Sequence, residues 1–161
     1  MEKYVEVYGD LLEQIHEFDA IAHGCNCFNM MGAGIAGAIS KKFPQAAAED
    51  AKTIKGSYNK LGTFTNVLIE GEENSTYILN LYTQFQGGAN LNLLALRMCM
   101  HKVNRYFKGK KVGLPLIGAG IAGGDWNVIS QVIKEELVNC YVTVVKLKEV
   151  VEVDTNINEL F

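Results

Sequence analysis

The sequence predicts an α/β fold, a three-layer α/β/α sandwich around a central mixed sheet. Segments typical of strands alternate along the chain with segments typical of helices. The chain has only 2 prolines, and its 16 glycines gather in a few clusters, which indicates long regular elements joined by short loops. Parallel neighbours in such a sheet need crossover helices, so we expect helices on both faces. A chain of 161 residues has room for one domain, which we take to span residues 1–161.

The first part of the chain is expected to form two strands followed by two helices. Residues 3–8 alternate between polar and apolar side chains, as a half-buried strand does. Residues 20–25 form a second predicted strand with apolar flanks. Residues 35–43 read as a helix, and Pro44 begins another, because proline is tolerated in the first turn of a helix.

A hairpin and a long helix are expected next. Residues 64–69 and 76–82 read as strands, and the turn between them lies at 71–74, where the sequence is Gly-Glu-Glu-Asn. Apolar residues keep near-helical spacing across residues 90–107, which predicts a helix there. The residues with this spacing are Leu91, Leu94, Ala95, Met98, Val103 and Tyr106.

The last part of the chain alternates again between strand and helix. Residues 112–115 are short and apolar, as a buried strand is, and a glycine-rich loop follows them. Residues 126–137 place their apolar side chains on one helical face, and residues 141–146 close the fold as a strand. The valines after residue 149 favour an extended or edge segment in the tail.

Composition and charge exclude several classes of protein. A hydrophobic fraction of 48% with 20% charged residues excludes a disordered or collagen-like chain. The apolar runs are shorter than ten residues and the N-terminus has no signal-peptide core, so we expect a cytoplasmic protein with no membrane partner. A net charge of −3 with 15 Lys and Arg argues against non-specific binding to nucleic acid. Any anionic ligand must therefore be held locally, by backbone amides or a few side chains.

The four cysteines do not form a metal-binding pattern. Cys25 and Cys27 make a single Cys-x-Cys pair, and Cys99 and Cys140 have no second pair or histidine cluster at a matching distance. Reduced thiols that pack as small apolar side chains are the expected state. We therefore expect no metal and no other cofactor.

The hexapeptide Gly-Ala-Gly-Ile-Ala-Gly occurs twice, at residues 32–37 and 118–123. Each copy is expected to follow a strand and to precede a helix. Glycine lets successive N–H groups converge, and a helix N-terminus adds a partial positive charge, so each loop is predicted to cradle an anion. If both loops lie at the carboxyl edge of the sheet, they can hold a diphosphate from opposite sides. The alternative is that both are merely tight strand-to-helix turns.

Two other nucleotide-binding motifs fit less well. The first copy has Gly-x-Gly-x-x-Gly spacing, but it follows the second predicted strand after an intervening loop, whereas the dinucleotide-binding motif follows the first strand. No P-loop lysine follows either glycine cluster, which excludes Walker-type nucleotide hydrolysis.

The order of these motifs resembles that of the macrodomain family, which binds ADP-ribose on an α/β/α fold. The resemblance covers residues 3–146. It implies that Asp10 accepts a hydrogen bond from the adenine amino group, that Leu11 lines the adenine pocket and that Asn26 contacts the distal ribose. It also implies that the two glycine loops hold the diphosphate and the distal phosphate region. The loop residues implied are Gly32, Ala33, Gly34, Ile35, Gly118, Ala119, Gly120, Ile121, Ala122 and Gly123.

Within the family, the chain is most similar to the subgroup that contains ADP-ribose 1''-phosphate phosphatases and de-ADP-ribosylating relatives. It departs from the commonest pattern at His23, where many members have Asn, and at Ala122, where many have an aromatic residue. The glutamate-linked ADP-ribosylhydrolases of this subgroup use a Lys and an Asp where this chain has Gln84 and Ala122. The resemblance therefore argues against a lysine-adduct mechanism.

His23 and Asp125 are the candidate catalytic residues. No Cys-x5-Arg or Asp-x-Asp phosphatase signature is present, so catalysis would require a phosphoryl group held on amides and a base that activates water. The pKa of histidine suits that work, but His23 can equally be a buried histidine bonded to backbone. Asp125 precedes a predicted helix and can serve as its N-cap, and Asp10 can cap a turn over residues 11–16.

The expected function is hydrolysis of ADP-ribose 1''-phosphate to release phosphate from the distal ribose. Two alternatives stay open: removal of ADP-ribose from protein or nucleic acid, and non-catalytic recognition of ADP-ribose. The expected partner is thus ADP-ribose or ADP-ribose 1''-phosphate, with nucleic acid only as an ADP-ribosylated substrate.

Overall fold

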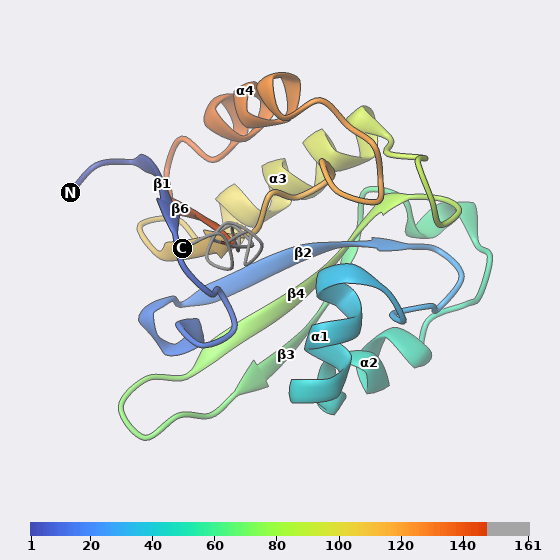
Figure 1. Cartoon of the computed structure of the whole chain (residues 1–161), viewed down its shortest axis with the longest axis horizontal. Coiled ribbons are helices and arrows are strands. Elements are labelled where there is room, and N and C mark those ends of the chain that lie inside the picture. Colours follow the sequence, from blue (N-terminus) through green and yellow to red (C-terminus); the bar gives the residue numbers. More distant parts are fainter. Residues whose placement is uncertain (148–161) are drawn as a thin grey trace, which may run out of the picture.

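The computed structural model describes residues 1–147, which form a six-stranded sheet with helices on both faces (Figure 1). The strand order is β1-β6-β5-β2-β4-β3, and all neighbours run parallel except β3 and β4, which form an antiparallel hairpin. The predicted α/β sandwich with a mixed sheet is confirmed. The strands are β1 (Tyr4–Tyr8), β2 (Ala20–Asn26), β3 (Phe64–Ile69), β4 (Thr76–Gln84), β5 (Lys111–Leu114) and β6 (Tyr141–Lys146).

Two pairs of helices cover the two faces of the sheet. Helices α1 (Gly34–Lys42) and α2 (Pro44–Ala51) pack on one face, and α3 (Leu93–Tyr106) and α4 (Trp126–Glu136) pack on the other (Figure 1). Because successive strand residues point to opposite faces, β2 sends Ile21 and Cys25 toward α1 and α2, and Ala20 and Ala22 toward α3 and α4. Strand β2 is therefore buried on both faces.

The element boundaries agree with the sequence except at a few ends. Strand β6 and the start of α2 at Pro44 lie where predicted, while β4 extends two residues further, to Gln84. Helix α3 begins later than expected, because the Asn92 side chain accepts a hydrogen bond from the Ala95 N–H at 2.9 Å and so caps it there. The expected segment after residue 149 lies outside the described residues.

The connections that follow the neighbouring strands β2 and β5 run to opposite faces of the sheet. After β2 the chain turns to α1, and after β5, which pairs with β2, it turns to α4 on the other face. Adjacent parallel strands whose connections diverge in this way leave a crevice outside their carboxyl ends, where open α/β folds bind ligands. The two glycine hexapeptides are the segments that follow β2 and β5. They lie with the loop after β4 on the right in Figure 1.

Candidate ligand-binding site

The two glycine loops meet across this crevice. A Cβ atom added to Gly34 would lie 3.3 Å from Cδ1 of Ile121, so the first loop contacts the second directly. By contrast, a Cβ atom added to Gly32 or to Gly120 would have no neighbouring atom within 4 Å. These two glycines therefore face open space in which a ligand can approach the backbone closely.

The two copies of the hexapeptide adopt different structures. The first straddles the start of α1, with Ala33 as the N-cap and Gly34 as the first helical residue. The second lies wholly in a loop, which closes on itself where the Gly124 N–H donates to the Gly118 carbonyl at 2.8 Å. The expectation that each copy precedes a helix holds for the second copy and fails for the first, which contributes the first turn of α1.

Both loops present backbone N–H groups that have no hydrogen-bond acceptor among residues 1–147. In the first turn of α1 these are the N–H groups of Gly34, Ile35 and Ala36, since the N-cap Ala33 offers no side-chain acceptor. In the second loop they are the N–H groups of Gly120, Ile121 and Ala122. Unpaired amides at a helix N-terminus and in a glycine turn form a site suited to an anion.

Asp10 and Leu11 follow β1 at the same edge of the sheet. The exposed Asp10 caps the turn after it, since its Oδ1 accepts hydrogen bonds from the N–H groups of Leu12 (3.1 Å) and Glu13 (3.2 Å). The Leu11 side chain is buried in the core beside Phe18. Strand β1 lies three strand spacings from β2, about 14 Å. Asp10 therefore lies where the far end of an elongated ligand could reach it, and Leu11 packs beneath it.

Asn26 uses both ends of its carboxamide to shape its own loop. Its Oδ1 accepts from the Phe28 N–H at 2.9 Å, and its Nδ2 donates to the Met30 carbonyl at 3.2 Å. It ends β2 as predicted and lies at the crevice. In this structure, however, its hydrogen-bonding groups hold the segment that leads to Gly32.

A buried lysine holds the same segment from below, which the sequence did not reveal. The Lys60 ammonium donates to the Cys27 carbonyl at 3.1 Å and to Asn29 Oδ1 at 2.6 Å, and it lies over the Tyr82 ring at 4.8 Å. Asn29 has a φ of 56°. This φ lies in the left-handed region, which Asn adopts more readily than most other residues, so an Asn at this position was a weak signal for it. Nothing in the local sequence indicates that Lys60 is buried.

A third loop, between β4 and α3, completes the crevice and was also missed. A Cβ atom on Gly87 would lie 3.7 Å from Asn26 Nδ2, and one on Gly123 would lie 2.9 Å from the Ala89 Cβ. The Gln84 side chain holds this loop by donating to the carbonyls of Gln86 (2.7 Å) and Gly88 (3.0 Å). The pair Gly87-Gly88, a few residues after a predicted strand, was the signal that could have found it.

His23 lies in the interior, away from the crevice. It is 0% exposed in the middle of β2, and its Nε2 donates to Asn80 Oδ1 at 2.7 Å. Asn80 in turn donates to the Ala46 carbonyl and to Thr65 Oγ1, both at 3.0 Å. Burial lowers the pKa of His23 to about 4, so the ring is neutral at pH 7. The expected catalytic role does not fit, because β2 directs this position toward the face that α1 and α2 cover.

Asp125 lies at the carboxyl edge, where it caps α4. Its Oδ1 accepts a hydrogen bond from the Asn127 N–H at 2.9 Å, and the residue is exposed. It follows the second glycine loop by two residues. Of the two catalytic candidates, the structure therefore brings only Asp125 to the site.

The comparison with protein families agrees with this geometry. Residues 22–133, which include both glycine loops, match the macro domain. The chain belongs to the macro domain family. The matched region covers β2 through most of α4, so it contains the crevice but not Asp10.

Two curated proteins and one solved structure show how widely this macro domain is shared. The chain is 38% identical over 136 residues to an uncharacterized 17.5 kDa protein of Enterobacteria phage T4, over 81% of this chain and 86% of that protein. It is 27% identical to an ADP-ribose 1''-phosphate phosphatase of Candida albicans, over 71% of this chain and 80% of that protein. A macrodomain protein from Streptomyces coelicolor has a TM-score of 0.71 at 25% identity, over 91% and 99% of the two chains.

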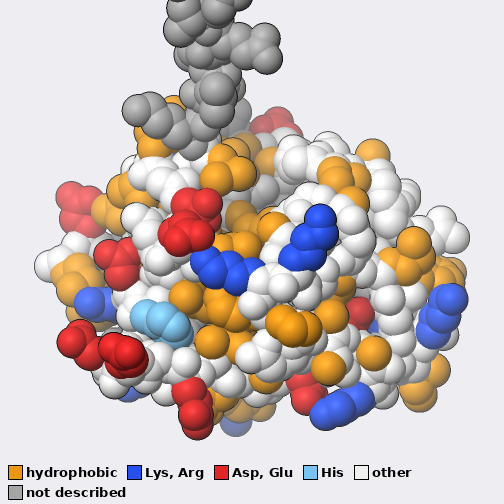
Figure 2. Space-filling view, turned by 60° about the horizontal axis from the view of Figure 1, so that its bottom comes forward, with side chains coloured by type: hydrophobic (Ala, Val, Ile, Leu, Met, Phe, Trp, Pro, Cys, Tyr) orange, Lys and Arg blue, Asp and Glu red, His pale blue; other side chains and the backbone are white. Residues whose placement is uncertain are grey.

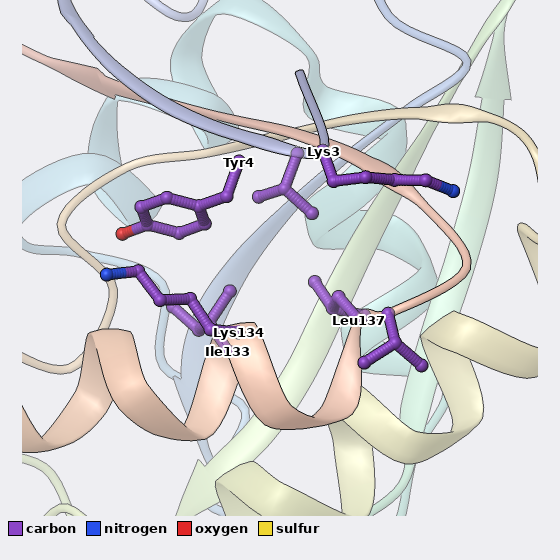
Figure 3. A pocket seen from close by; sticks show the side chains of 7 residues that line it. Lys3, Tyr4, Ile133, Lys134 and Leu137 are labelled. Atoms are coloured by element: carbon purple, nitrogen blue, oxygen red, sulfur yellow. The ribbon is translucent and has the colours of Figure 1, made fainter. Parts of the chain in front are cut away.

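Other features of this macro domain lie apart from the crevice. A surface hollow of about 270 Å³ opens between the start of β1 and the end of α4, lined by Lys3, Tyr4 and Lys134 among others (Figure 3). Because β1 starts there, the hollow lies at the opposite edge of the sheet from the glycine loops.

On the face in Figure 2, Lys and Arg side chains are spread among acidic, hydrophobic and uncharged ones. Among residues 1–147, no helix is long and apolar enough to cross a bilayer.

Proposed function

We propose that this macro domain binds ADP-ribose across the carboxyl edge of its sheet. The observation that carries the proposal is the contact between the two glycine loops, each of which has unpaired backbone N–H groups. A diphosphate between them receives hydrogen bonds from both sides without a cationic side chain. This arrangement also explains how a protein with a net charge of −3 can hold a strongly anionic ligand.

The strand order supports one orientation of the proposed ligand. Asp10, expected from the family resemblance to contact adenine, follows β1 at one end of the parallel strands. The two glycine loops follow β5 and β2, and Asn26 with the Gly87 loop lies toward β4. The adenine therefore lies toward β1, the diphosphate at the β5–β2 crevice and the distal ribose toward β4.

The reaction that we propose is hydrolysis of ADP-ribose 1''-phosphate. The relative of that name from Candida albicans supports it, as do the unpaired amides of the two glycine loops. In this step a water oxygen bonds to phosphorus, the bond from phosphorus to the ribose oxygen breaks, the ribose oxygen takes up a proton, and phosphate and ADP-ribose result. Asp125 is the base we assign to take the water proton, because its second oxygen, Oδ2, has no hydrogen bond within residues 1–147.

Binding of ADP-ribose without turnover is the second candidate. The observation that favours it is the burial of His23, because it leaves Asp125 as the one candidate base. Asp125 already caps α4. Calorimetric titration with ADP-ribose, followed by phosphate release from ADP-ribose 1''-phosphate, separates the two. Binding with release supports the phosphatase, and binding without release supports the second candidate. Release of ADP-ribose from a modified protein or oligonucleotide, assayed in parallel, would instead indicate an ADP-ribosyl hydrolase.

A further inference from the structure

Three aromatic side chains from separate segments pack together at the carboxyl edge, beyond the end of β4. The Tyr58 ring, in the short helix η2 (Tyr58–Lys60), stacks on the Phe85 ring with centroids 3.7 Å apart and planes 6° apart. Phe28 meets Phe85 edge to face at 4.9 Å. Tyr58 is nevertheless 69% exposed, so one side of its ring is covered and the rest is open to solvent. The stack thus holds an exposed ring in a fixed orientation.

This aromatic stack adjoins the distal end of the proposed ADP-ribose site. The Phe28 N–H donates to Asn26 Oδ1 at 2.9 Å, and Phe85 directly follows Gln84, whose side chain holds the Gly87 loop. Counted from β1, strand β4 lies beyond β2 in the sheet. The segment with Tyr58, teal in Figure 1, lies on the same side as the glycine loops. A group attached to the distal ribose would therefore extend toward the stack.

The segment that carries Tyr58 has exposed lysines although the chain as a whole is acidic. Residues 51–69 contain three lysines and no acidic residue, and acidic residues lie at positions 49, 50 and 70 on either side of them. Lys52 pairs with Glu49 at 2.6 Å, and Lys60 is buried. Within residues 1–147, Lys55 is thus the exposed cation of this segment that has no ion pair.

We propose that Tyr58 and Phe85 form a platform on which a base of a single-stranded nucleic acid stacks, with Lys55 beside the strand's phosphates. An open aromatic ring stacks on any base, and a cation beside it can contact a phosphate, so the pair binds single strands without regard to sequence. The net charge of −3 limits the contact to this small region, so the affinity is modest and falls with salt. That the platform acts together with bound ADP-ribose rests on the proposed function. A nucleic-acid strand that carries ADP-ribose would then place one of its bases on the platform.

The test measures the affinity of the full chain for a fluorescein-labelled oligothymidylate of about ten nucleotides, by anisotropy at low salt. We expect Tyr58→Ala to weaken binding about five-fold or more, and Tyr58→Phe to retain it because the ring is kept. Lys55→Ala is expected to reduce the slope of log K against log salt by about one. Tyr106→Ala is the matched control, since Tyr106 is 70% exposed, as Tyr58 is, but ends α3 at the opposite edge of the sheet.

The platform is overturned if the wild type does not bind oligothymidylate, or if Tyr58→Ala and Tyr106→Ala lose equal affinity. Tighter binding of an aromatic peptide than of the oligonucleotide, with the peptide alone sensitive to Tyr58→Ala, also overturns it and assigns the surface to a protein partner. Calorimetry with ADP-ribose is run on the same samples. Failure of the wild type to bind ADP-ribose refutes the proposed function, whereas normal ADP-ribose binding with no oligonucleotide binding refutes the platform alone.

Discussion

The Lys60 ammonium and the Asn29 carboxamide oxygen lie 2.6 Å apart beneath the loop that follows β2. Lys60 is 7% exposed, and its second acceptor is the Cys27 carbonyl of the same loop. Asn29 has a left-handed backbone, a conformation with few alternatives for a non-glycine residue. The contact therefore holds in place the segment that carries Gly32 and the start of α1.

We predict that Lys60→Met weakens ADP-ribose binding about ten-fold and lowers the free energy of unfolding by about 2 kcal/mol. The variant leaves the Cys27 carbonyl and Asn29 Oδ1 without their donor, which costs free energy in the folded state and frees the loop. Urea unfolding and calorimetry at a temperature where the variant is folded measure the two effects. Lys52→Met is the control, because that lysine is exposed and makes only a surface ion pair. Equal affinities for the two variants would show that Lys60 does not position the loop.

Gly32 and Gly34 should respond differently to the same small substitution. Gly34 has a φ of 57° and faces Ile121, so Gly34→Ala is expected to destabilise the fold by about 1–2 kcal/mol. Gly32 has no positive φ and faces open space, so Gly32→Ala should leave the free energy of unfolding nearly unchanged. Chemical unfolding of both variants tests the contrast. Equal destabilisation would mean that the two loops do not meet as described.

The buried His23 predicts how stability depends on pH. Its pKa is about 4 in the folded protein and about 6.5 when unfolded, so between these values the unfolded chain binds more protons. Stability from this group is complete above pH 6.5 and falls as the pH is lowered toward 4, by about 3 kcal/mol in total. Unfolding of His23→Gln across this range should show a flatter profile than the wild type. His101→Gln, at an exposed site, is the matched control.

Asp125→Asn separates the capping role of this residue from a catalytic one. Asn caps helices as well as Asp does, so the free energy of unfolding should change by less than about 0.5 kcal/mol. Asn cannot accept a proton from water, so phosphate release should fall about 100-fold or more. Asp125→Ala should lose both activity and about 1 kcal/mol of stability. Phosphate release by Asp125→Asn at the wild-type rate would remove Asp125 from the mechanism.

The sequence was sufficient to predict the fold and the two loops, because both depend on local patterns. Strand and helix periods were visible in single segments, and a hexapeptide repeated after two strands pointed to one edge of the sheet. The cap at Asp125 was also evident, because it depends only on the residues that follow it. What the sequence could not show was how β2 and β5 come to be neighbours, which is decided by packing on both faces.

The burial and the partners of His23 and Lys60 could not be predicted from the local sequence. The face of the sheet on which the His23 side chain lies depends on how β2 pairs with β4. A register shift of one residue would move this side chain to the other face. Lys60 is a residue type that is almost never buried unless paired, and its acceptors come from a segment about thirty residues earlier. Both assignments required the tertiary structure.

The most direct test of the binding site is calorimetric titration of ADP-ribose into the wild type and into Gly120→Val. A Cβ atom at Gly120 would have no neighbour within 4 Å and the φ of Gly120 is not positive, so the variant should fold with an unchanged unfolding midpoint. The two-loop site predicts that the wild type binds ADP-ribose and that folded Gly120→Val does not. Wild-type affinity in the folded variant would contradict it.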